Sequence, residues 1–175
     1  MLLAGVVIAL AATALAALLH ETRPPAAPHR VNVAISSRPQ PPALTVEQER
    51  YATTLWAVHR EVTPSAVAMS FAGIAYQTEG RNARELARRI EPLAKFFHDA
   101  EGRVRALSAP ASLSETHERY IEAMALYARA AGEMLTFTED GDARHLADAH
   151  RMGVTASEDL LRAGEVLWPG QYKPH

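Results

Sequence analysis

The chain has 175 residues, of which 22% are charged, and its formal net charge is −2. This balance gives no electrostatic reason to expect nucleic-acid binding, which needs a basic surface. Cysteine is absent, which excludes disulfides, thiolate metal sites, a cysteine nucleophile and a cysteine-linked lipid anchor. Alanine, leucine, arginine and glutamate are abundant, and these residues lose little side-chain freedom in a helix. We therefore expect an all-α protein.

The first 19 residues are hydrophobic, and residues 2–19 contain no charged side chain. This length reaches the roughly 18 residues at which a membrane span becomes a candidate. Small residues such as Ala12 and Ala14 also provide cleavage positions typical of a signal peptide. The pattern predicts a membrane anchor or a signal segment at residues 1–19, and both alternatives stay open. As an anchor, residues 2–19 would hold the protein on the membrane.

The charges around this segment and the linker after it favour opposite locations. Arg23, Arg30 and Arg38 follow the segment and no basic residue precedes it, so the positive-inside rule taken alone would leave the domain in the cytoplasm. A hydrophobic N-terminus followed by a proline-rich spacer is typical of an exported domain. We expect a membrane-anchored or secreted protein whose domain lies outside the cytoplasm, in the periplasm or at the cell surface.

Residues 20–43 are predicted to form a linker. Six prolines fall in it: Pro24, Pro25, Pro28, Pro39, Pro41 and Pro42. Proline lacks a backbone donor and fixes φ, so neither helix nor sheet is sustained. An extended polyproline stretch rises about 3.1 Å per residue and could hold the domain roughly 60 Å from a membrane. Val31, Val33 and Ile35 alternate with smaller or polar residues, as in a β-strand. An alternative interpretation is therefore a strand that adds to the edge of a partner's sheet.

Residues 44–170 are predicted to form one domain of four helices, followed by a tail at 171–175. Apolar residues recur at alternating steps of three and four, as in a helix with one buried face. The helices are expected at about 45–77, at about 83–107, from Ser112 to the turn at 139–142, and from that turn to Leu167. The apolar stripe of the first helix consists of Tyr51, Leu55, Val58, Val62, Ser65, Met69, Ala72 and Tyr76.

Two prolines fall inside the first two predicted helices. The apolar stripes keep their phase across Pro64 and Pro92, which favours continuous but kinked helices over breaks. Each interior proline costs on the order of 3 kcal/mol, which packing has to offset. Since short connections make neighbouring helices antiparallel, we predict an up-down-up-down four-helix bundle with a kinked first hairpin.

Motifs that carry enzymatic chemistry are missing. The sequence has no G-x-G-x-x-G, Walker or G-x-S-x-G motif, and no C-x-x-C-H for covalent haem. The nearest match to a zinc-protease motif begins at His117, but Ile121 stands where the second histidine is needed. No nucleophile and base can be paired, so we expect a protein that is not an enzyme.

Histidines provide the one candidate metal site. His117 falls on the apolar stripe of the third helix, and the helix heights place His59, His98 and Glu158 near its level. Imidazoles and a carboxylate from facing helices can bind zinc or copper, and a histidine can hold non-covalent haem. The competing interpretation is that His117 is a core histidine with a hydrogen-bond partner, while His59 and His98 flank the core or face solvent.

The second helix carries a row of arginines. Arg81, Arg84 and Arg88 share one face, with acidic residues interspersed. This mixture is typical of an ordinary solvated face, although a basic face can also contact anionic lipid or polymer.

The stretch Pro110-Ala111-Ser112-Leu113, followed by His117, Tyr120, Tyr127 and an Asp-Gly turn, resembles the second hairpin of small uncharacterised bacterial proteins. These are secreted or membrane-tethered proteins with helical-bundle domains, and the resemblance covers about residues 105–167. It implies an extracytoplasmic bundle and supplies no activity, cofactor or site residue. Together these features predict a non-enzymatic bundle that contacts an unknown protein partner at the cell envelope. Histidine-based metal or haem binding is the alternative.

Overall fold

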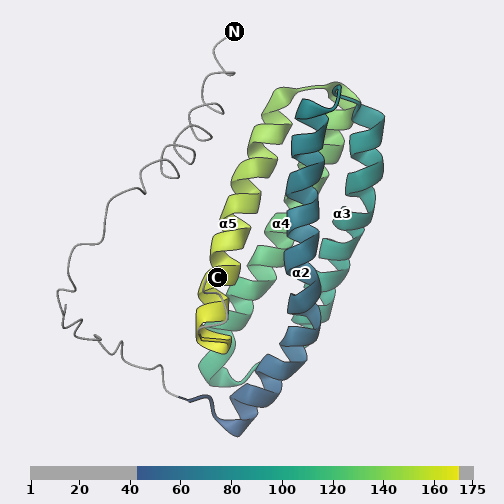
Figure 1. Cartoon of the computed structure of the whole chain (residues 1–175). Helices are drawn as coiled ribbons and strands as arrows, with labels where there is room; N and C mark the ends of the chain where they lie inside the picture. The colour runs from purple at the N-terminus through teal and green to yellow at the C-terminus, as the bar shows by residue number, and fades with distance from the viewer. Residues whose placement is uncertain (1–42, 170–175) are drawn as a thin grey trace, which may run out of the picture. The chain divides into compact units, whose positions relative to one another are not determined.

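The structure is a computed structural model that describes residues 43–169, so the expectations for residues 1–19, for nearly all of the linker and for the tail fall outside it. Its elements are α2 (Val46–Thr78), α3 (Ala83–Arg105), a 3₁₀ turn η1 (Ala111–Leu113), α4 (Ser114–Asp140) and α5 (Ala143–Leu167) (Figure 1). The prediction of an all-α domain with four helices packed against each other is confirmed.

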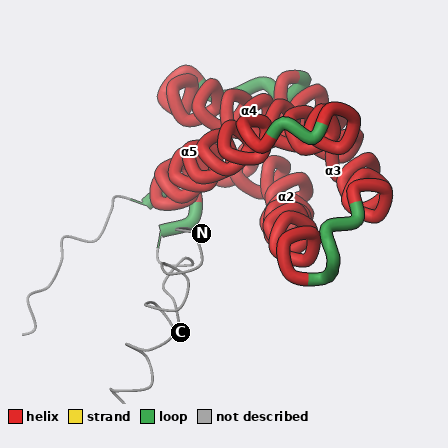
Figure 2. The backbone as a smooth tube through the Cα atoms, turned by 90° about the horizontal axis from the view of Figure 1, so that it is seen from above, coloured by secondary structure: helices red, strands yellow, loops and turns green. Residues whose placement is uncertain are grey.

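Consecutive helices lie side by side and run in opposite directions (Figures 1 and 2). The most extensive packing joins α4 to α5 and α3 to α4, and α2 packs against α3. The first and last helices, α2 and α5, contact each other only sparsely. The seam between α2 and α5 is therefore the loosest part of the described domain.

Side-chain caps set the starts of three helices. Thr45 forms a capping box with Gln48 at the start of α2, and Asn82 accepts a hydrogen bond from the backbone N–H of Glu85 in α3. Asp142 caps α5 in the same way. These side chains satisfy backbone donors that have no partner inside a helix. Gly141, with a φ of 74°, ends α4 in the left-handed conformation that glycine adopts at little cost.

The third predicted helix begins two residues later than expected. Ser112 and Glu115 have the spacing of a capping box, but Ser112 lies in the 3₁₀ turn and α4 starts at Ser114 without a side-chain cap. The hydroxyl of Ser112 instead accepts a hydrogen bond from Gln48 of α2 at 3.0 Å. The tight turn also buries Leu113. The predicted helix start at Ser112 is therefore wrong, because the hydroxyl of Ser112 bonds a side chain of another helix and does not cap α4.

The predicted apolar stripes form the core. In α2 every residue of the predicted stripe is buried except Ser65 and Tyr76, which are half-buried. Both α2 and α3 continue through their prolines, Pro64 and Pro92. At the centre of the core, Phe97 of α3 stacks on Tyr127 of α4 with ring centroids 4.8 Å apart.

The arginines of α3 pair with carboxylates. Arg88 and Arg89 both bond Glu85 one turn away, and Arg89 also reaches Glu79 across the turn between α2 and α3. Such exposed pairs contribute little to stability, but they leave this face with mixed charge. No helix within residues 43–169 combines the length and the apolar character that crossing a membrane requires.

Candidate functional site

An apolar groove of about 740 Å³ lies between α2 and α5. Its walls are the stretch of α2 from His59 to Gln77 and the stretch of α5 from Leu146 to Leu161. Tyr127 and Met134 of α4 also line it. This volume is within the range of ligand-binding clefts. The groove follows the seam along which α2 and α5 make few contacts.

The α2 wall has an unusual sequence. From Val62 to Thr78 it contains no aspartate, glutamate, lysine, arginine or histidine. Besides the stripe that faces the core, this stretch carries Val67, Phe71 and Ile74, with relative exposures of 47%, 62% and 54%. A helix that is apolar on several faces is normally buried, and apolar clusters left exposed mark interaction sites.

The α5 wall adds a second row of exposed apolar side chains. Val154 and Leu161 are 44% and 49% exposed. Between the two rows, Gly153 leaves the groove open. A Cβ atom placed there would have Met69 as its nearest neighbour, at 4.0 Å. A Cβ atom at Gly153 would therefore make an ordinary van der Waals contact with the flexible end of Met69.

Two hydroxyl groups beside the groove, on Tyr127 and Ser157, have hydrogen-bond partners within the protein. Ser157 donates a hydrogen bond to the carbonyl of Gly153 at 2.8 Å, so the hydroxyl of Tyr127, also 2.8 Å away, donates to Ser157. Met69 and Met134 supply flexible side chains that adapt to the shape of an occupant. The lining thus favours an apolar occupant over a highly polar one.

At one end of the seam, aromatic rings join α2 to the end of α5. Trp168 lies against Trp56 and His59, with centroid distances of 5.0 and 4.7 Å. His59 is buried, and its Nδ1 lies 2.9 Å from the hydroxyl of Tyr120. This cluster closes the seam where α5 ends, and the groove opens beyond it.

A second histidine–tyrosine pair crosses from α2 to α4. Nδ1 of His117 lies 2.8 Å from the hydroxyl of Tyr51, and both side chains are buried. Burial raises the pKa of Tyr51 to about 12 and lowers the pKa of His59 to about 4, because an apolar interior disfavours both charged forms. Tyr51 and His59 are therefore neutral near pH 7. The core interpretation of His117 is the one that this geometry supports.

The four residues of the predicted metal site have different surroundings. His59 and His117 are buried against tyrosines, whereas His98 on α3 and Glu158 on α5 are exposed. Between residues 43 and 169, no three or more histidine, aspartate and glutamate side chains are grouped so that they could hold a metal ion. Zinc, copper or haem binding stays a prediction from the sequence.

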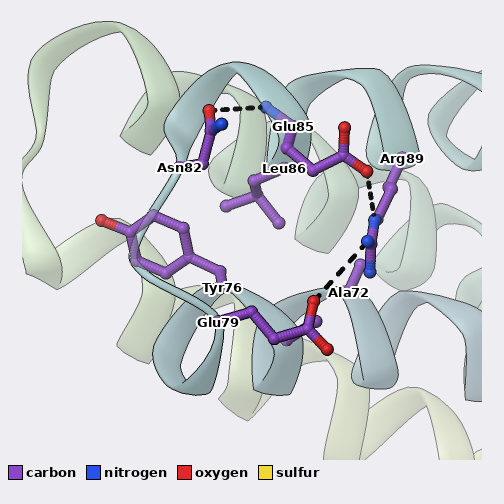
Figure 3. Close-up of a pocket in the computed structure, with 8 residues that line it drawn as sticks. Ala72, Tyr76, Glu79, Asn82, Glu85, Leu86 and Arg89 are labelled. Atoms are coloured by element: carbon purple, nitrogen blue, oxygen red, sulfur yellow. Dashed lines mark hydrogen bonds and ion pairs between the residues drawn. The ribbon is translucent and has the colours of Figure 1, made fainter.

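A much smaller cavity of about 30 Å³ lies where α2 meets α3. Figure 3 shows Tyr76 and Leu86 beside it, with Arg89 between Glu79 and Glu85. This volume is far below the roughly 300–1,000 Å³ of ligand-binding pockets. The small cavity is therefore a gap beneath an ion-pair network, and the groove is the candidate site.

The turn between α4 and α5 holds a third histidine between two carboxylates. Nδ1 of His145 lies 2.5 Å from Glu133, and its Nε2 lies 3.0 Å from Asp140. The hydrogen bond that the imidazole donates to Glu133 is the main cause that raises the pKa of His145, and Asp140 adds to it. When it is protonated, the imidazole links the last turns of α4 to the first turn of α5 through both carboxylates.

We expect this link to weaken in alkaline solution. Because the folded state raises the pKa of His145 above its ordinary value near 6.5, its contribution to stability is complete below that value. The contribution disappears as the pH rises through the raised pKa. Urea unfolding from about pH 5 to about pH 9 should therefore show a loss of stability in the wild type that is smaller in His145→Gln. His98→Gln, on the exposed face of α3, is the control, and parallel curves for wild type and His145→Gln would contradict the link.

The chain matches none of the protein-family models, curated proteins or solved structures with which it was compared. A function for the groove therefore has to be argued from its own geometry.

Proposed function

We propose that the chain is a membrane-tethered or secreted helical bundle outside the cytoplasm, and that it acts by protein–protein contact without catalysis. The observation that carries the proposal is the apolar groove between α2 and α5, with exposed apolar side chains along both rims. Such a surface is costly to leave in water and is typical of an interaction site. The contact is made by an apolar or amphipathic helix that lies in the groove.

The dimensions of the groove suit a helix. Its α2 wall runs from His59 to Gln77, which corresponds to about 27 Å at a rise of about 1.5 Å per residue. The rim residues Val67, Phe71 and Ile74 follow each other at steps of four and three. Grooves that bind helices meet their ligands through side chains at such spacings. A partner helix of about 15 to 18 residues would fill the length.

The exposed rims favour a helix over a small apolar ligand. Phe71 and Ile74 are each more than half exposed, so a single acyl chain along the floor would leave them in water. A helix about 10 Å wide would cover both rims. Burying the exposed parts of these two side chains would contribute about 1 kcal/mol each.

The kinked first hairpin belongs to the same proposal. Pro64 stands near the start of the groove wall and lacks the N–H that would bond the carbonyl of Arg60. A bend at Pro64 would change the direction of the uncharged half of α2 relative to its first half. Pro92 would allow a matching bend in α3, which packs against α2.

Photo-crosslinking in cells tests the proposal with the full chain. With a photoreactive phenylalanine analogue at position 71, we expect a crosslink to a protein, because this exposed side chain lies at the contact. The matched control adds Gly153→Leu, which fills the groove from the α5 side. We expect the variant to fold, since Gly153 is helical, a Cβ atom there meets only the flexible end of Met69 at 4.0 Å, and a helical glycine costs roughly 0.5–1 kcal/mol.

Two results would contradict protein contact at the groove. One is the absence of any crosslinked protein from position 71 when the chain is folded and the analogue is incorporated. The other is a crosslink of equal yield with Gly153→Leu, because a leucine that narrows the groove beside Met69 should weaken the binding of its occupant. The same analogue at Arg88, on the far side of the bundle, measures random collision.

A further inference from the structure

We infer that the helix received by the groove is α2 of a second copy of this chain, so that the protein forms a twofold dimer. The inference rests on the proposed function, because it names the partner for the same groove. It would make each α2 both a wall of its own groove and the occupant of the other.

The charge of the groove restricts its occupant. The wall formed by α2 offers no charged group from Val62 to Thr78, so a charged side chain on the occupying face would be buried without a partner. The same stretch of α2 meets this requirement, since it is uncharged on every side. Among the four described helices it is the longest run without a charged residue. Two copies can therefore approach without repulsion and without burying an unpaired charge.

The length of the stretch also fits. The groove wall extends from His59 to Gln77, and the uncharged run extends from Val62 to Thr78. The uncharged part of α2 in one copy is therefore about as long as the groove of the second copy that it would occupy. In a twofold arrangement one surface serves both copies, as in most homodimers.

The order of side chains supports an antiparallel contact. If the axis passes between Ser70 and Phe71, each Phe71 lies against the partner subunit's Ser70, where the smaller side chain leaves room. Val67 then lies against the partner subunit's Ile74, so the three exposed apolar residues of α2 are all covered. Val154 and Leu161 of α5 would close against the partner's α2. The interface would be a layer of four helices, with α2 and α5 contributed by each copy.

Cysteine crosslinking tests the dimer directly, because the chain has no cysteine of its own. Ser70→Cys in the full chain, produced in cells and treated with a short membrane-permeant bismaleimide, should yield a product of twice the chain mass. Arg88→Cys on α3, whose side chain is 75% exposed, is the matched control. We expect at least ten-fold more product from Ser70→Cys than from this control. Co-production of a longer tagged copy should add a band of intermediate mass.

A second variant tests the interface in the same background. Adding Phe71→Glu to Ser70→Cys should reduce the crosslinked product at least ten-fold, because it places a charge opposite an uncharged helix. Phe71→Leu should retain the product. Phe71 is mostly exposed, so the fold should persist, and an unchanged circular dichroism spectrum would verify this.

The outcomes separate the inference from the proposed function. If Ser70→Cys gives no more dimer product than Arg88→Cys and its thiol is linked to a different protein, the second-copy inference is overturned and the proposed function stands. If that thiol reacts freely with a monofunctional maleimide, without a crosslink and without a photo-crosslink from position 71, both are overturned. If the crosslinked dimer of Ser70→Cys persists when Phe71→Glu is added, the proposed interface is also overturned.

Discussion

Phe97→Ala is expected to lower the free energy of unfolding by about 3–5 kcal/mol. The ring of Phe97 is fully buried in α3 and stacks on Tyr127 of α4, so its removal takes away apolar contacts and leaves a cavity between the two helices. The loss would be a large fraction of the roughly 5–15 kcal/mol that stabilises a typical domain. Urea unfolding followed by circular dichroism measures it.

The adjacent residue provides the matched control for this prediction. Phe96 has the same side chain on the same helix but is only half-buried. Phe96→Ala removes the same atoms and should cost clearly less, since part of its ring already faces water. Equal losses for the two variants would contradict the placement of Phe97 at the centre of the core.

The second large effect is expected in acid. Burial lowers the pKa of His59 to about 4 in the folded state, while the unfolded chain has a value near 6.5. The stability that neutral His59 contributes is therefore present above about pH 6.5. It is lost as the pH falls towards 4, because the unfolded state takes up a proton that the folded state excludes. The difference of about 2.5 pKa units corresponds to roughly 3 kcal/mol.

His59→Gln isolates this contribution. The variant cannot titrate at position 59, so the difference in unfolding free energy between wild type and variant should shrink by roughly 3 kcal/mol from pH 7 to pH 4. His145 and the carboxylates titrate in both proteins, and their effects cancel in the difference. A difference that stays constant over this range would show that His59 is not buried as a neutral group.

The two histidine–tyrosine pairs have a mechanical consequence for the groove. They join α2 to α4 through Tyr51–His117 and Tyr120–His59, both in the first half of α2. Beyond His59 no further histidine–tyrosine pair joins α2 to α4 within the described residues, and the core contacts of α2 there are mainly apolar. The fixed half of α2 thus positions the uncharged half, and the edge contact of Tyr76 with Phe137 of α4, at 5.1 Å between ring centroids, holds the other end of the wall.

Chain connectivity explains why the groove lies where it does. Short connections bring α2 to α3 and α4 to α5, and a 3₁₀ turn precedes α4. No short connection joins α2 to α5, so the distance between these two helices is set by their side chains alone. Trp168 closes one end of it, whereas Gly153 provides no side chain further along. A groove between α2 and α5 is therefore compatible with undistorted packing of α2 on α3, α3 on α4 and α4 on α5.

Most of the helical architecture could be read from the sequence. The steps of three and four identified the residues that face the core, and the start of the second helix at residue 83 was placed correctly. These features are local, because a helix period and a cap depend on residues a few positions apart. Ser112 was misplaced because its hydroxyl bonds Gln48 in another helix, and no local pattern contains that contact.

The sequence by itself therefore determined the number of helices, their inward faces and the absence of cysteine chemistry. The uncharged run from Val62 to Thr78 is also visible in the sequence. The sequence did not show that this run lines a groove, because an uncharged helix can be covered on all sides. Only the tertiary structure decided that Phe71 stays exposed and that His59 is buried against Tyr120. The exposure of Phe71 and the burial of His59 both depend on the distances between helices. These distances are set by how side chains of different helices pack against each other.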